Sequence, residues 1–117
     1  MLDFAAYNRT RPAGDRGTFC HAPSINLNFE QNGNVTACCY NRKFTLGTYP
    51  RDSIEAIWSG PKVRELREAL RGNDLSKGCD ICREQLEARN FRNMRARHFD
   101  SESLRRPEGP GLATGMP

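Results

Sequence analysis

The chain has 117 residues, carries a formal net charge of +4 and is 37% hydrophobic. This length suits one domain, and the low hydrophobic fraction predicts a core too small to be self-sufficient, so a bound metal or a cross-link is expected to stabilise it. The 18 Lys and Arg are interspersed with 14 Asp and Glu, which makes the net charge a weak sign of a polyanionic partner. No apolar run is long enough to predict a membrane span.

The first 18 residues mix Asn, Arg, Pro and Gly without a hydrophobic period, which predicts an irregular leader over residues 1–18. They also lack the basic-then-apolar layout of a signal peptide, so a cytoplasmic protein is expected. The cysteine count of five is odd, which argues against a complete disulfide framework. In a reducing compartment such cysteines more often bind metal or perform redox chemistry.

A β-hairpin is predicted next. Apolar residues at 25, 27 and 29 alternate with polar ones, which is the period of a strand with one buried face. Asn32-Gly33 is the favoured pair for a two-residue turn because both positions need positive φ. The return strand is then expected over residues 35–40.

This turn predicts a register that distinguishes two adjacent cysteines. Pairing Gln31 with Asn34 places Leu27 opposite Cys38 on the apolar face. Cys39, one residue on, then points to the opposite face. Cys38 is therefore the expected ligand of the two.

Helices are predicted in the second half. A short helix starts near Asp52, and a second runs from Pro61 to a stop at Gly72, with apolar residues on one stripe. A last helix of poor period is expected from about Cys82 towards His98. These elements predict a small α+β, metal-stabilised domain with one β-hairpin, two short helices and a C-terminal helical extension.

Four cysteines form the candidate site. Cys79 and Cys82 are separated by two residues, a spacing that turns both thiolates toward one centre in zinc sites and iron–sulfur clusters alike. Cys20 precedes the first expected strand and Cys38 lies on its partner, so the hairpin brings them together. Zinc or an iron–sulfur cluster could be held by Cys20, Cys38, Cys79 and Cys82. Buried free cysteines, a redox-active pair or disulfides remain the alternatives.

These residues resemble the SPASM or twitch family, the auxiliary-cluster domain of radical SAM enzymes. The likeness runs through Cys20-His-Ala-Pro23, Gly33-Asn-Val-Thr-Ala-Cys-Cys39, Leu46-Gly47, Ser53-Ile-Glu-Ala-Ile-Trp58 and Cys79-Asp-Ile-Cys82. It implies one [4Fe-4S] cluster on the four cysteines and a cluster-binding domain over residues 19–88. The extra cysteines that full SPASM domains use for a second cluster are lacking, which resembles the single-cluster twitch form.

The resemblance also implies a function. The Cys-x3-Cys-x2-Cys motif of the radical SAM barrel is absent from this sequence, so the chain is not expected to be catalytic alone. An iron–sulfur accessory or electron-relay module is expected, acting with a radical SAM enzyme or binding that enzyme's peptide or protein substrate. The alternative is a small zinc-stabilised module that recognises a protein or nucleic acid through a basic C-terminal helix.

The remaining candidates have plainer interpretations. His21 could replace a ligand, but four cysteines already complete the set. Cys39 is expected to be a small residue on the outer face with no ligand role, and Trp58 is expected to belong to the core. The arginines of a basic helical extension over residues 89–106 are interrupted by acids nearby and suit a solvated face, so nucleic-acid binding is not the main expectation. Residues 107–117, rich in Pro and Gly, predict a disordered tail.

Overall fold

A computed structural model describes residues 2–104 of the chain. The fold combines short helices with one small antiparallel sheet, which confirms the predicted mixed α+β class. Among these residues, no helix has the length and apolar character that a membrane span requires. The elements in chain order are α1 (Phe4–Asn8), η1 (Ala13–Asp15), α2 (Ala22–Ile25), β1 (Asn28–Phe29), β2 (Asn34–Thr36), β3 (Gly47–Thr48), α3 (Ile54–Trp58), α4 (Pro61–Arg71), α5 (Asp80–Glu87), η2 (Phe91–Asn93) and α6 (Arg97–Leu104).

The hairpin forms, but its predicted register is wrong by one residue. Phe29 lies opposite Val35, where position 36 was expected. The backbone N–H of Glu30 donates to the carbonyl of Asn34 at 2.9 Å, so three residues rather than two make the loop. Gly33 closes this loop at φ 95°, the left-handed conformation that three-residue hairpin loops require.

The sheet also differs from prediction at both ends. Ile25, which was expected to start the first strand, is instead the last residue of α2. This helix has Pro23 in its first turn, a position where a missing N–H costs nothing. A third strand, β3, pairs with β2 and was not predicted. Its two residues, Gly47 and Thr48, are too few to show a hydrophobic period.

The central helices follow the sequence pattern closely. α4 begins at Pro61 and ends before Gly72, as predicted, and its apolar stripe is fully buried at Val63, Leu66 and Leu70. α3 begins at Ile54, close to the predicted start near Asp52, and Ser53 caps it by accepting from the N–H of residue 56.

The C-terminal region forms two separate α-helices, α5 and α6, where one helix was expected. α5 ends before Arg89, which adopts φ 55° and therefore cannot continue the helix. The chain then passes through η2 and forms α6. The tail expected over residues 107–117 lies outside the described residues.

The segment expected to be an irregular leader contains a helix. In α1, Tyr7 is fully buried and its ring lies 5.6 Å from that of Phe19. The side chain of Asp3 caps this helix by accepting from the N–H of Ala6 at 2.9 Å. This five-residue helix is thus stabilised by distant residues that cover the side chain of Tyr7.

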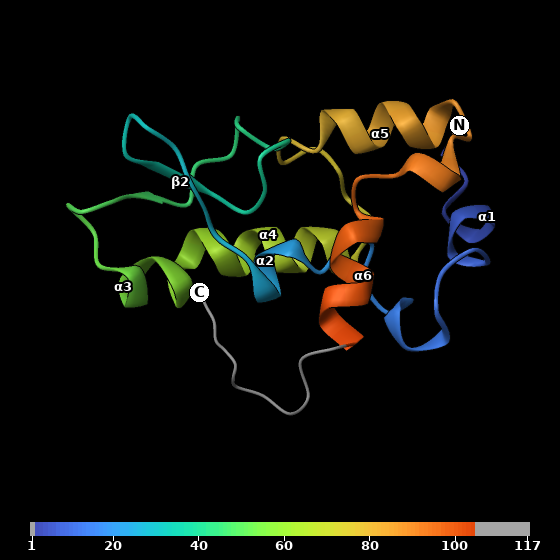
Figure 1. Ribbon diagram of the computed structural model, residues 1–117, viewed down its shortest axis with the longest axis horizontal. Coiled ribbons are helices and arrows are strands. Elements are labelled where there is room, and N and C mark those ends of the chain that lie inside the picture. Colours follow the sequence, from blue (N-terminus) through green and yellow to red (C-terminus); the bar gives the residue numbers. More distant parts are fainter. Residues whose placement is uncertain (1, 105–117) are drawn as a thin grey trace.

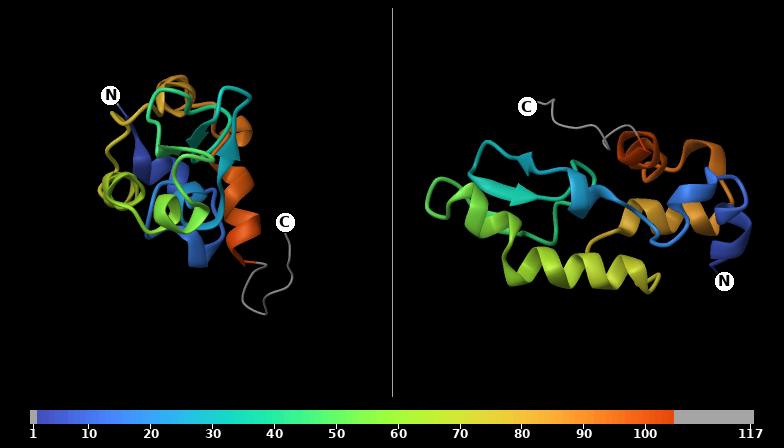
Figure 2. Two further views of the ribbon diagram at one scale, coloured as in Figure 1. Left: turned by 90° about the vertical axis from the view of Figure 1, so that its left-hand side faces the viewer. Right: turned by 90° about the horizontal axis from the view of Figure 1, so that it is seen from below.

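Figure 1 shows how these elements surround the core. The sheet and α3 lie at one end, α1 and α5 lie at the other, and α4 extends between them. The right-hand view of Figure 2 shows the same separation, with α6 beside the N-terminal segment, where it contacts η1. The fully buried core side chains include Tyr7, Phe19, Val35, Val63, Leu66, Leu70 and Leu86.

Candidate metal centre

The first pair of cysteines stands at the start of α5. Cys79 is its N-cap and Cys82 lies in its first turn, so both thiols sit where the chain turns into the helix. Gly78 precedes them at φ 86°, and a Cβ there would clash with the side-chain oxygen of Asn41. Glycine is therefore required at this close approach.

The second pair comes from two loops. Cys20 lies two residues before α2 and is 8% exposed, and the N–H of Ala22 donates to its Sγ at 3.4 Å. Cys38 follows β2 and is half-buried, with backbone N–H groups of Tyr40 and Asn41 directed at its thiol. Both sulfurs thus meet backbone donors.

One pocket brings the four sequence-predicted cysteines together. Its walls are mostly apolar, from α2, α4, α6 and the residues after β2. All five cysteines of the chain lie within the described residues, and none is in a disulfide. The other residues lining this cysteine pocket are Phe19, Ala22, Pro23, Ala37, Tyr40, Asn41, Leu66, Leu70, Ile81, Arg95, Ala96 and Phe99.

Burial and crowding make the thiols hard to ionise. Burial, and after it the charge of neighbouring thiolates, raises the pKa of Cys79 to about 12 and that of Cys82 to about 11. The pKa of Cys20 is raised strongly by burial and also by the other three cysteines. Because a metal binds thiolates, a cationic centre in this pocket would have to supply the charge that favours ionisation.

Hydrogen-bond donors around the sulfurs lower the pKa of the thiols. Backbone N–H groups of Ala96 and Arg95 lower the pKa of Cys82. The amide Nδ2 of Asn41 lies 3.7 Å from Cys79 Sγ and donates to the carbonyl of Lys77 at 2.8 Å. Four thiols with such donors in an apolar pocket suit either a zinc ion or an iron–sulfur cluster.

The other sequence candidates lie elsewhere. Cys39 is exposed and does not line the cysteine pocket. His21 turns away from it, and its Nε2 lies 3.4 Å from Asp15 Oδ1. Trp58 is only half-buried, with the guanidinium of Arg67 4.9 Å from its ring centroid, so its predicted core role is wrong.

Sequence reasoning missed Asn41, which supports Cys79, and Arg95, which lines the pocket. The guanidinium of Arg95 lies 4.9 Å from the ring centroid of Tyr40. The run Cys38-Cys39-Tyr40-Asn41 offered one signal, because Asn after an expected ligand often makes local hydrogen bonds. No local pattern pointed to Arg95.

A groove adjoins the cysteine pocket on the side of Cys38. The pocket and the groove share Cys38, Tyr40, Arg95 and Phe99, so of the four site cysteines the groove reaches Cys38. We call it the Arg95 groove; its lining is Asn26, Asn28, Cys38, Cys39, Tyr40, Met94, Arg95, His98 and Phe99.

Comparison with known proteins gives one match. The model of the SPASM family, described as an iron-sulfur cluster-binding domain, matches residues 20–84. No curated protein and no solved structure matches the chain. The matched segment contains the four cysteines that line the pocket, while α1, η1 and α6 lie outside it.

Proposed function

The chain belongs to the SPASM family of iron–sulfur cluster-binding domains, and from this premise we propose that it is a single-cluster electron-relay module acting with a radical SAM enzyme. SPASM domains typically occur in radical SAM enzymes. The proposed ligands are Cys20, Cys38, Cys79 and Cys82, and the proposed cofactor is one [4Fe-4S] cluster.

The convergence of four thiols carries the proposal. They come from three segments far apart in the sequence, yet all line one apolar pocket. Four cysteines are the full complement of one cubane cluster. When bound, such a cluster accepts and donates single electrons.

The spacing of the sulfurs favours a cluster over zinc, because among the described residues no three of the four Sγ atoms lie within 4.8 Å of one another, whereas thiolates around a single zinc ion lie closer than that. The residues around the sulfurs suit a redox centre. Backbone N–H groups are directed at Cys20, Cys38 and Cys82, and an amide lies near Cys79. Such donors disperse thiolate charge and set the potential of a redox centre. A zinc-stabilised binding module would use the same sulfurs and is the second candidate, since zinc accepts four thiolates.

The Arg95 groove supports a relay role because it connects solvent with Cys38. Its rim carries the guanidinium of Arg95, which would attract an acidic redox partner or a substrate carboxylate. We place this exchange in the reducing cytoplasm, where free thiols persist.

Anaerobic reconstitution with iron and sulfide tests the proposal. We expect brown protein with about four iron and four sulfide per chain and a visible absorption that bleaches on reduction. Protein that stays colourless and retains about one zinc per chain after the same treatment would favour the zinc module instead. Purification under anaerobic conditions is essential, because zinc can otherwise fill a thiolate site.

A further inference from the structure

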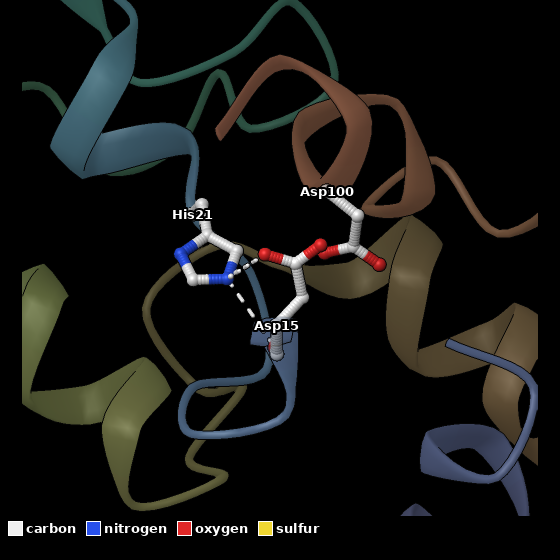
Figure 3. A group of neighbouring side chains, drawn as sticks. All are labelled: Asp15, His21 and Asp100. Atoms are coloured by element: carbon white, nitrogen blue, oxygen red, sulfur yellow. Dashed lines mark hydrogen bonds and ion pairs between the residues drawn. The ribbon is translucent and has the colours of Figure 1, made fainter. Parts of the chain in front are cut away.

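A second set of potential ligands lies away from the cysteine pocket. Asp15 ends η1, His21 precedes α2 and Asp100 belongs to α6. One ligand atom from each lies within 4.8 Å of the other two. Figure 3 shows the Asp15 carboxylate between the other two side chains, with one oxygen toward His21 and the other toward Asp100.

The two carboxylates are buried together, which is unfavourable unless something compensates their charge. Asp15 is 1% exposed and Asp100 is 2% exposed. Burial raises the pKa of Asp15, and the charge of Asp100 raises it further. Like charges held this close in a dry site need a cation or a shared proton.

One oxygen of the group has no partner. Oδ2 of Asp15 is buried and makes no hydrogen bond with any atom in the described part of the chain. Its other oxygen lies 3.4 Å from Nε2 of His21. A buried, unsatisfied carboxylate oxygen beside a second carboxylate indicates a missing electropositive group.

Arg11 only partly fills this role. Its guanidinium donates two hydrogen bonds of 2.9 Å to the oxygens of Asp100 and none to Asp15. The guanidinium therefore neutralises Asp100 directly and acts on Asp15 only through its charge. The same arrangement would orient Asp100 as a ligand, because carboxylates that bind metals are usually hydrogen-bonded to neighbours.

We propose that Asp15, His21 and Asp100 form a site for one divalent first-row metal ion, separate from the cysteine pocket. One imidazole nitrogen and two carboxylate oxygens suit Mn²⁺, Fe²⁺ or Zn²⁺, whereas an all-oxygen set would suit Ca²⁺ or Mg²⁺. With bonds of about 2.1 Å, ligand atoms around an octahedral ion are about 3 to 4.2 Å apart, so a small closure of the observed spacing suffices.

The position of this site fits a structural role for the ion. Asp15 and Asp100 lie outside the segment that matches the family model, and His21 lies next to a cluster ligand inside it. An ion on these three residues would fasten η1 and α6 to the start of the cluster-binding segment. His21 is 17% exposed and offers the ion its path from solvent.

Manganese distinguishes this site from the cysteines because Mn²⁺ prefers oxygen and nitrogen ligands to thiolates. The full chain is first loaded anaerobically with its cluster and then titrated with Mn²⁺ near neutral pH, with free Mn²⁺ followed by electron paramagnetic resonance. We expect saturable binding of about one Mn²⁺ per chain and a rise in the unfolding temperature with Mn²⁺ concentration.

Asp15→Asn is the decisive variant because it keeps the side-chain shape and removes the charge. Its Mn²⁺ affinity should fall at least about tenfold while the visible absorption of the cluster is unchanged. Glu55→Gln, on exposed α3, is the matched control and should bind Mn²⁺ like the unaltered chain. Absence of saturable binding, equal affinity in Asp15→Asn, or stabilisation by this substitution without any Mn²⁺ effect would overturn the proposal; the last result would identify a shared proton.

Discussion

At the scale of single residues, the adjacent cysteines Cys38 and Cys39 differ in environment and should differ in effect. Cys38 lines the cysteine pocket, whereas Cys39 is exposed. Cys38→Ser should lose most of its iron and unfold at lower temperature, because ligand binding and folding are coupled in a domain with so small a core. Cys39→Ser should keep its iron content and its unfolding temperature. Iron and sulfide analysis with thermal unfolding measures this, and equal loss in the two variants would contradict the ligand assignment.

The sequence pointed to Cys38, but not for the reason that the structure provides. Strand alternation was expected to direct Cys38 inward, yet β2 ends at Thr36 and the register is shifted by one residue. Residues 35, 36 and 37 are all buried, so alternation does not operate here. The turn after β2, with N–H groups of Tyr40 and Asn41 directed at the thiol, holds Cys38 in the pocket.

At the scale of elements, the turn before α5 determines where Cys79 lies. Gly78→Ala would place a β-carbon against Asn41 and would force a non-glycine residue into φ 86°. We expect a loss of about 1–3 kcal/mol in the free energy of unfolding and incomplete cluster loading, since Asn41 also lies near Cys79 Sγ. Denaturant unfolding and the iron content per chain measure the two effects.

A matched substitution controls for the loss of glycine alone. Gly17→Ala has open space around the added carbon and no positive φ, so stability should change by no more than about 0.5 kcal/mol. A Gly78→Ala protein with unaltered stability and full iron content would show that this turn does not position the cysteine.

Elements differ in how well the sequence predicted them, and length explains the difference. α4 has eleven residues, a proline start and a buried stripe, so its period was readable. α1 and β3 have five and two residues and depend on long-range contacts such as that of Tyr7 with Phe19. The same limit hid the Asp15, His21 and Asp100 group, whose members come from separate segments.

At the scale of the whole molecule, the folded unit extends beyond the segment that the family model matches. Residues before Cys20 contribute Tyr7 to the core, and residues after Glu84 contribute Leu86, Met94 and Phe99. Both flanks meet where η1 contacts α6. The cluster-binding segment is therefore covered on one side by its own N- and C-terminal flanks, which places Arg95 and Ala96 on the cysteine pocket.

The ion pair between Arg11 and Asp100 joins these flanks. Removing it tests whether the flanks stabilise the folded domain. Both side chains are almost fully buried, at 0% and 3% exposure, and the contact is bidentate. Arg11→Met leaves Asp100 buried without its partner and beside Asp15, which should cost about 3–5 kcal/mol in the free energy of unfolding. Arg9→Ala, at an exposed position two residues earlier, should change stability by no more than about 0.5 kcal/mol. Denaturant unfolding of the cluster-loaded proteins measures both, and similar stabilities would mean that the flanks fold independently of the cluster-binding segment.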